Sequence, residues 1–164
     1  MAADKFPVTP AIRVLRAHGV AFQSHLYDYQ PRGGTAHSAS ELGVDEHIVI
    51  KTLVLVDDQQ KPLIALMHGD LEVSTQGARQ HLGRRSIEPA DPTVATKHSG
   101  YEVGGTSPFG LRKPLPVYLQ ASIVQLPLIY INGGKRGYLV SLAPSEVVRV
   151  LSAQPVEMAA GRPR

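Results

Sequence analysis

The sequence predicts an α+β fold: one domain in which helices surround a mixed, largely antiparallel sheet. Its 164 residues suit a single compact domain with its own hydrophobic core. Helical and strand-like patterns follow one another without regular alternation, which is typical of this class. The chain carries no internal repeat and no linker long enough to separate two domains.

The first expected element is a helix. Thr9 supplies a capping hydroxyl, Pro10 suits the first helical position, and Gly19 ends the helix. A strand is expected next, over 20–29. The segment 31–38 is rich in Pro, Gly and Ser, so we expect a loop there.

A second helix is expected to begin in a capping box at 38–41 and to stop at Gly43. Asp45 is expected to start one further helical turn. The apolar run 48–56 and the run 62–67 are predicted strands. Because a polar turn joins these two runs, we expect a hairpin.

Turn and capping signals also punctuate the second half of the chain. The expected elements are, in order, a helix over 75–82 capped by Ser74 or Thr75, an extended piece from Ile87, a helix from Asp91 to Gly100, strands over 116–119, 128–131 and 138–142, and a helix over 144–151. A turn over 133–137 is expected to join the last two strands. The domain is therefore expected to span 1–153, followed by a flexible tail over 154–164.

Composition excludes several classes of protein. Hydrophobic content of 43% and charged content of 19% indicate neither disorder nor a membrane protein. No apolar run approaches the roughly 20 residues that span a bilayer. The chain has no cysteine, which excludes disulfides, thiolate metal sites and a thiol nucleophile. Its seven histidines are scattered, and we expect neither a metal site nor a cofactor.

The same composition bears on location and on nucleic-acid binding. Residues 1–5 lack the basic start and apolar run of a secretory signal, so a cytoplasmic location is expected. A net charge of +3 permits contact with phosphate. With six tyrosines, three phenylalanines and no tryptophan, a stacking platform for a single strand is not expected. A bound nucleic acid is expected to contact the chain through its backbone or one terminal nucleotide.

Lys51 stands inside the most apolar run of the chain. Strand alternation places it on the same face as Val49, Leu53 and Leu55. A charge there snorkels to water, pairs with an anion, or meets a negatively charged ligand. Two interpretations stay open: a lysine whose stem packs on the sheet, or a pocket lysine that neutralises phosphate or a developing oxyanion. Thr52, on the opposite face, either donates a hydrogen bond to a ligand or satisfies strand propensity.

A second candidate element is the run of Gly104, Gly105, Thr106, Ser107 and Pro108. Consecutive glycines permit positive φ and close approach of a ligand to backbone N–H groups. Such a loop can hold a carbonyl or oxyanion by its amides. The alternative is an ordinary turn between a helix and a strand. It is not a nucleotide P-loop, because the Gly-Lys-Ser/Thr ending is missing.

The third candidate element is formed by Asn132, Gly133, Gly134, Lys135 and Arg136. Asn-Gly is a common hairpin signal, so one interpretation is a tight turn with basic residues on its solvent side. In the other, Lys135 and Arg136 contact RNA phosphate, and Asn132 points toward the bound ligand. No serine–histidine–acid order or close carboxylate pair accompanies these elements. An enzyme built this way relies on positioning, backbone donors, water and the substrate's own groups.

In this order, the three elements resemble the YbaK/EbsC family, free-standing relatives of the editing domain inserted in bacterial prolyl-tRNA synthetases. The resemblance runs from Thr9 through Leu151. The matching segments are 9–11, 50–53, 90–92, 100–110 and 133–137.

The resemblance implies a mixed sheet partly closed like a barrel and the hydrolysis of mischarged aminoacyl-tRNA. The best-known members clear Cys-tRNA(Pro), and others in the superfamily remove alanine or other small amino acids. For cysteine the implied mechanism is substrate-assisted: the aminoacyl thiol attacks its own ester carbonyl and expels the tRNA. Prolyl-tRNA synthetase is the implied partner that delivers the tRNA.

Residue roles follow from the same resemblance. Lys51 matches the family's functional lysine, Gly104 and Gly105 match the loop around the aminoacyl carbonyl, and Tyr27 matches an aromatic at the pocket mouth. The implied site has Lys51, Gly104 and Gly105 as catalytic residues, Tyr27, Thr52, Thr106, Ser107, Pro108, Asn132, Gly133 and Gly134 as substrate-binding residues, and Lys135 and Arg136 toward the tRNA.

Two features depart from the cysteine-clearing relatives. Many of those carry a small hydroxyl residue where this chain has Asn132, and their loop at 31–38 is longer and contributes a pocket aromatic. Both features touch the expected aminoacyl pocket, so the amino acid removed is left open. A function of another class is also left open: a non-catalytic module that binds tRNA or a synthetase, or that regulates.

Overall fold

The computed structural model describes residues 6–160 of the chain. Residues 1–5, which carry the prediction about a secretory signal, and 161–164, the end of the predicted tail, lie outside the described residues. Within the described part, no helix is both long enough and apolar enough to cross a bilayer.

The elements occur in an irregular order along the chain. The strands are β1 (Gln23–Leu26), β2 (Val49–Asp57), β3 (Pro62–His68), β4 (Glu72–Val73), β5 (Ile87–Pro89), β6 (Val117–Gln120), β7 (Ile129–Lys135), β8 (Tyr138–Leu142), β9 (Gln154–Val156) and β10 (Ala159–Ala160). The helices are α1 (Pro10–Ala17), α2 (Gly34–Leu42), α3 (Thr75–Leu82), α4 (Pro92–Ser99) and α5 (Pro144–Leu151), with short 3-10 helices η1 (Glu46–Ile48) and η2 (Ala121–Gln125).

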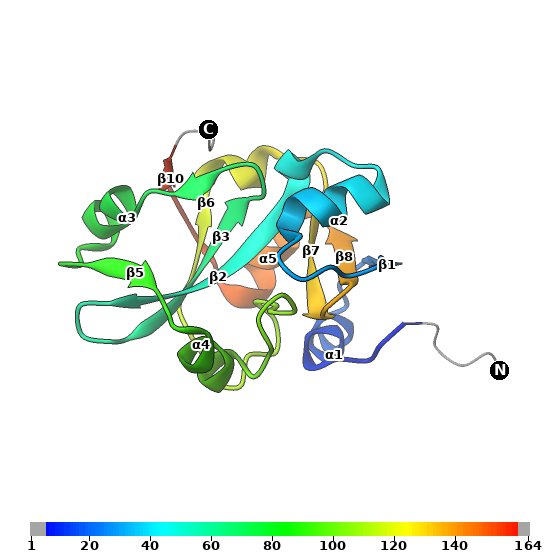
Figure 1. Ribbon diagram of the computed structural model, residues 1–164, viewed down its shortest axis with the longest axis horizontal. Helices are drawn as coiled ribbons and strands as arrows, with labels where there is room; N and C mark the ends of the chain where they lie inside the picture. Colours follow the sequence, from blue (N-terminus) through cyan, green and yellow to red (C-terminus); the bar gives the residue numbers. More distant parts are fainter. Residues whose placement is uncertain (1–5, 161–164) are drawn as a thin grey trace.

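A mixed sheet runs through the middle of the molecule (Figure 1). Over residues 6–160 it has eight strands, in the order β1-β8-β7-β2-β3-β6-β9 with β5 also paired to β2. The β2–β7, β3–β6 and β6–β9 pairs are parallel, and the β1–β8, β7–β8, β2–β3 and β2–β5 pairs are antiparallel. The predicted α+β class with a mixed sheet is confirmed. In the described part β1 and β9 are the two ends and do not pair with each other, so the sheet is not closed.

The two edges of β2 are covered unequally. β3 pairs with one edge along most of the strand. On the other edge, β7 pairs with 49–50 and β5 pairs with 55–57. Between them, the N–H of Ala90 donates to the carbonyl of Val54 at 3.0 Å. No strand of the described part covers 51–54 on this edge, and we call this interruption the β2 gap.

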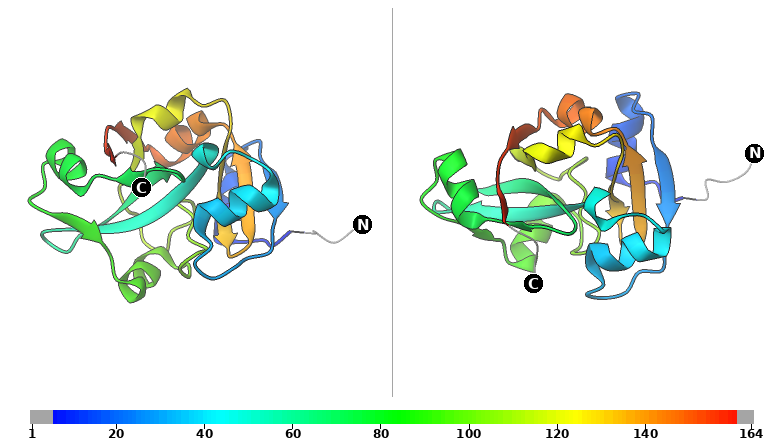
Figure 2. Two further views of the ribbon diagram at one scale, coloured as in Figure 1. Left: turned by 45° about the horizontal axis from the view of Figure 1, so that its top comes forward. Right: turned by 90° about the horizontal axis from the view of Figure 1, so that it is seen from above.

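Helices pack on both faces of the sheet; α2 and α5 lie on opposite sides (Figures 1 and 2). Ile50 and Val54 of β2 belong to the largest core cluster, together with residues of α1, α5, β7 and β8. Leu53 and Leu55 pack in a second cluster that includes Ala78 of α3. The predicted alternation of β2 is therefore confirmed, and Lys51 lies on the face of Leu53 and Leu55.

The predicted helix starts hold at most positions, because the capping residues act as expected. Thr9 accepts a hydrogen bond from the N–H of Ile12 at 3.1 Å at the start of α1. Ser74 accepts from the N–H of Gly77 at 3.0 Å in α3. Asp45 accepts from the N–H of His47 at 3.0 Å in η1. These hydroxyl and carboxylate caps satisfy donors that a helix start leaves free.

The predicted capping box at 38–41 is wrong. α2 begins at Gly34, so Ser38 lies inside the helix and its hydroxyl donates to the carbonyl of Thr35 at 3.2 Å. The glycine-rich start is typical of a loop, and tertiary packing overrides it, since Ala39 is buried against residues of β2 and β8. The helix does stop before the left-handed residue Gly43, as expected.

The predicted turn over 133–137 is also displaced. β7 continues to Lys135, and its pairing with β8 shifts register between Asn132 and Lys135, which is a β-bulge. Gly133 gives room to the ring of Tyr138, because a Cβ there would lie 2.8 Å from Cδ2. The Asn-Gly pair therefore marks the bulge, and the turn comes after Lys135.

The prediction of a flexible tail is wrong for residues 154–160. β9 pairs with β6, and β10 pairs with β4. Met158 is buried, and its N–H donates to Oε1 of Gln120 at 2.8 Å. Residues 154–160 are thus part of the fold. These strands were not predicted because their sequence shows no strand periodicity. Pairing with β6 and β4, instead of local propensity, holds them extended.

Candidate functional site

A cavity of about 620 Å³ lies beside the β2 gap. We call it the edge cavity. Its wall is built by residues 49–54 of β2, residues of the segment 27–32, the first turns of α2, residues of the loop 103–106, and Asn132 of β7. The lining is mainly apolar, with a few hydroxyl, amide and cationic groups, which is the usual make-up of a small-ligand site.

Lys51 lies in the wall of the edge cavity, and 18% of its side chain is exposed. Its Nζ is 3.2 Å from Oε1 of Glu72, a partner that the sequence did not indicate. The same lysine borders a second depression, of about 550 Å³, that also includes Glu46 and Asp70. Because the Glu72 side chain is 58% exposed, the ion pair contributes only about 0–1 kcal/mol. A bound anion can therefore replace this carboxylate.

Thr52 carries a hydroxyl that no residue of the range 6–160 pairs with. Its Oγ1 is buried and has no hydrogen-bond partner in the described part of the chain. Such a hydroxyl costs about 1–3 kcal/mol when nothing pairs with it. Since the carbonyl of Val54 points toward Ala90, strand alternation turns the N–H and C=O of Thr52 toward the same edge, into the β2 gap.

The two glycines of the loop 103–106 are needed for close packing. Gly104 has φ +89°, and a Cβ there would lie 2.7 Å from the hydroxyl of Tyr29. A Cβ on Gly105 would lie 2.9 Å from the backbone nitrogen of Arg136. The loop can pack this closely against Tyr29 and Arg136 only because both side chains are absent.

Asn132 fastens this loop to the bulge of β7. Its Nδ2 donates to the carbonyl of Gly104 at 3.0 Å. Its Oδ1 accepts from the N–H groups of Gly134 and Lys135, at 2.7 and 3.2 Å. The carboxamide is therefore largely committed within the protein, and the structure favours a positioning role over the predicted contact with substrate.

Arg136 is a second clamp on the same loop. Its Nε donates to the carbonyl of Val103 at 2.8 Å, and its Nη1 lies 3.5 Å from a carboxylate oxygen of Glu102. Its guanidinium also stacks over the ring of Tyr29, 5.3 Å from the centroid. The neighbouring Lys135 is exposed and has no ion pair within residues 6–160. Of the two predicted tRNA-binding cations, Lys135 is the one left for an external anion.

The predicted site residues divide into two groups. Those that line the edge cavity are Tyr27, Lys51, Thr52, Gly104, Thr106, Asn132 and Arg136. Those that do not line it are Gly105, Ser107, Pro108, Gly133, Gly134 and Lys135. Ser107 is fully buried, and its Oγ accepts from the N–H of Phe109 at 3.1 Å. Ser107 and Pro108 thus support the loop on the side away from the edge cavity, whose wall includes neither residue.

Two aromatic rings of the wall were not among the predicted residues. Tyr29 follows Tyr27 by two positions, so the alternation of an extended segment could have identified it. His37 lies in the segment expected as a loop, and α2 brings it into the wall, with its ring in edge contact with that of Tyr27. Partial burial raises the pKa of Tyr27, so this phenol stays neutral and can donate a hydrogen bond.

Comparison with known proteins assigns this arrangement to a family. Residues 31–150 match the pattern of the aminoacyl-tRNA editing domain. The chain belongs to this family. The predicted resemblance is confirmed, and the chain is an aminoacyl-tRNA editing protein.

Several relatives show how far the similarity extends. EbsC of Enterococcus faecalis, named for Cys-tRNA(Pro)/Cys-tRNA(Cys) deacylation, is 28% identical over 151 residues, 92% of each chain. A proline–tRNA ligase of Citrifermentans bemidjiense is 36% identical over 85 residues, which are 52% of this chain and 15% of the ligase. A solved structure described as a trans-editing enzyme for prolyl tRNA synthetase superposes with a TM-score of 0.81 at 22% identity, covering 94% of this chain and all of the other.

Proposed function

We propose that this chain is a free-standing deacylase of mischarged tRNA(Pro), and that the edge cavity binds the aminoacyl ester. The observation that supports this most is the meeting of Lys51, Gly104 and Asn132 in one cavity, from three distant parts of the sequence. The similarity to EbsC and to part of a proline–tRNA ligase supports the choice of tRNA and of ester. A cytoplasmic location, where tRNA is charged, goes with this function.

Lys51 is proposed to hold the anionic end of the substrate. Its ammonium is available once the weak pair with Glu72 gives way. A cation at this point lowers the energy of a phosphate or of negative charge that develops on the ester during attack. In this role Lys51 binds and stabilises charge, and it does not act as a nucleophile.

The loop of Gly104 is proposed to receive the ester carbonyl. The N–H of Gly105 already donates to the carbonyl of Glu102 at 2.9 Å. This leaves the N–H groups of Gly104 and Thr106 for the oxyanion. Fixed backbone donors stabilise such charge without reorganisation, and removal of one donor typically costs about 100- to 1,000-fold in kcat.

The attacking group is proposed to come from the substrate or from water. With cysteine, the thiol sulfur bonds to the ester carbon, the C–O bond to the ribose breaks, and the thiol proton passes to the ribose oxygen. His37 can carry that proton: its Nε2 lies 2.6 Å from the carbonyl of Asp28, so Nε2 bears hydrogen and Nδ1 is left as a base. With an amino acid that has no thiol, water takes the place of the thiol.

The test is a panel of tRNA(Pro) charged with cysteine, alanine, serine or threonine, with and without prolyl-tRNA synthetase. We expect one member to be hydrolysed, and Lys51→Ala to lower kcat/KM for it at least about 100-fold. Lys61→Ala is the matched control. Lys61 is an exposed lysine in the turn between β2 and β3, outside the edge cavity. If all four esters are stable, the deacylase proposal is wrong. Binding of tRNA without turnover would then favour the non-catalytic module.

A further inference from the structure

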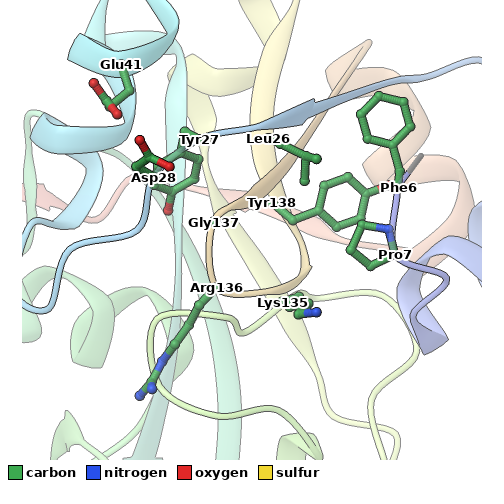
Figure 3. A pocket seen from close by; sticks show the side chains of 10 residues that line it. All are labelled: Phe6, Pro7, Leu26, Tyr27, Asp28, Glu41, Lys135, Arg136, Gly137 and Tyr138. Carbon is green, nitrogen blue, oxygen red and sulfur yellow. The ribbon is translucent and has the colours of Figure 1, made fainter.

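Another concave surface, distinct from the depression beside Glu46 and Asp70, adjoins the edge cavity. It has a volume of about 780 Å³ and is more open, and we call it the aromatic groove. Figure 3 shows its lining: Phe6, Pro7, Leu26 and Tyr138 gather at one end, Asp28 and Glu41 lie at another, and Lys135 and Arg136 come from the end of β7 and the turn after it. Tyr27 and Arg136 line both the groove and the edge cavity, so the two are neighbours that share part of their walls.

The groove has an aromatic surface that stays exposed. The rings of Phe6 and Tyr138 are stacked, with centroids 6.2 Å apart and planes 10° from parallel. Tyr138 is buried, and its hydroxyl lies 2.7 Å from Oγ of Ser24, so it is a fixed support. Phe6 is 38% exposed and Leu26 is 51% exposed. A supported aromatic ring at the surface is the feature on which an unpaired base stacks, worth about 1–3 kcal/mol for each base.

The charges of the groove match a nucleotide as well. Lys135 is exposed and has no ion pair within residues 6–160, whereas Arg136 is held by Val103 and Glu102. Lys135 is thus the cation available for a phosphate. The carboxylates of Asp28 and Glu41 lie away from the aromatic end, where they repel a phosphate and so favour its placement at Lys135.

We propose that the aromatic groove binds the unpaired nucleotide next to the terminal adenosine of the tRNA, with its base on Phe6 and its phosphate at Lys135. This inference rests on the proposed function, because it requires the ester in the edge cavity. The 3′ end of a charged tRNA is single-stranded, so the nucleotide that precedes the ester must leave the edge cavity past a shared wall. Tyr27 and Arg136 form such a wall.

The test compares two substrates that carry the same amino acid. One is an acceptor minihelix with its full single-stranded 3′ end, and the other is aminoacyl-adenosine, which has no preceding nucleotide. We expect Phe6→Ala and Lys135→Ala each to lower the ratio of kcat/KM, minihelix over aminoacyl-adenosine, about fivefold to tenfold. Lys135→Ala should also reduce the salt dependence of minihelix binding by about one phosphate contact. Val124→Ala and Lys61→Ala, which replace an exposed apolar residue and an exposed lysine outside the groove, should leave the ratio as in the wild type.

The outcomes distinguish failure of the groove proposal from failure of the proposed deacylase function. An unchanged ratio in both Phe6→Ala and Lys135→Ala overturns the groove while the deacylase stands. A change only in the response to prolyl-tRNA synthetase assigns the groove to a protein contact and also overturns it. If the wild-type protein hydrolyses neither substrate, the deacylase itself fails and the groove proposal fails with it. Unfolding midpoints of the variants show whether Phe6→Ala disturbs the fold.

Discussion

Asn132 and Gly104, 28 residues apart in sequence, are joined by a hydrogen bond of 3.0 Å from the Asn132 carboxamide to the Gly104 carbonyl. Because the other end of the carboxamide accepts two backbone N–H groups, this side chain ties the loop directly to the β7 bulge, beside the clamp made by Arg136. The site is therefore positioned by a residue that is itself not free to bind the substrate.

Asn132→Ala is expected to loosen the loop 103–106 and to lower kcat/KM for deacylation about tenfold, which corresponds to about 1.4 kcal/mol. Hydrogen exchange of the loop amides should rise in parallel. Gln125→Ala, at an exposed amide outside the site, is the control. Full activity together with faster exchange would show that loop position does not limit the reaction.

Gly104→Ala is expected to impair the site more than the fold. The new methyl group would lie 2.7 Å from the hydroxyl of Tyr29, so the loop has to move. Gly83→Ala is the matched control, because Gly83 also has positive φ (+66°) but nothing lies within 4 Å of the added methyl. Both changes should lower the free energy of unfolding by about 1 kcal/mol. Only Gly104→Ala should lower kcat/KM, and equal activities would contradict the role of the loop.

Glu72→Gln is expected to free the ammonium of Lys51. The ion pair is partly exposed and contributes little, so the free energy of unfolding should change by less than about 0.5 kcal/mol. Without a competing carboxylate, KM for the charged tRNA should fall about twofold to fivefold. A rise in KM would mean that Glu72 orients Lys51 for the substrate instead of competing with it.

Thr52→Val tests the unpaired hydroxyl. Removal of a buried hydroxyl without a partner should raise the free energy of unfolding by about 1 kcal/mol, as measured by urea denaturation. Thr9→Val makes the same chemical change where the hydroxyl accepts from Ile12 and donates to Gly133, and it should lower that free energy by about 1–2 kcal/mol. Destabilisation by Thr52→Val would show that a water or a protein group pairs with the hydroxyl.

The pH dependence of stability is expected to report on His68. Burial lowers the pKa of this fully buried imidazole below its ordinary value of 6.5. Below pH 6.5, His68 is therefore protonated more readily in the unfolded chain than in the folded chain. Stability is complete above pH 6.5 and falls as the pH drops toward the folded pKa, by at most about 1.4 kcal/mol per pH unit.

His68→Gln should flatten part of this decline between pH 7.5 and 5.5. It should also cost about 1–3 kcal/mol at neutral pH, because Nδ1 donates to the carbonyl of His47 and Nε2 accepts from Ser122, both at 2.7 Å. Part of the decline is expected to remain, since burial also lowers the pKa values of His25 and His98. An equal slope of stability against pH in the wild type and the variant would rule out a contribution from the titration of His68.

Most helices and strands were predictable because their signals are local. The helix cap at Thr9 and the strand alternation around Lys51 each depend on only a few adjacent residues. Residues 154–160 and the start of α2 were not, since partners far away in sequence hold them in place.

The candidate site divides along the same line. Lys51 and Gly104 could be identified from residue type and spacing. Whether Asn132 faces a ligand or Gly104 is decided by the bulge in β7, and the pairing of Lys51 with Glu72 depends on where β4 lies. Neither contact can be predicted from adjacent residues, because each joins elements that are brought together only in the folded chain.

The β2 gap makes the size of the edge cavity adjustable. Its two limits are the Ile50–Ile131 pair, where the pairing of β2 with β7 ends, and the Leu55–Pro89 pair, where the pairing with β5 ends. Extension of either pairing by one residue would narrow the opening without any change to the pairing of β2 with β3. The width of the opening and the packing of the core therefore depend on different backbone pairings, and one can change while the other is kept.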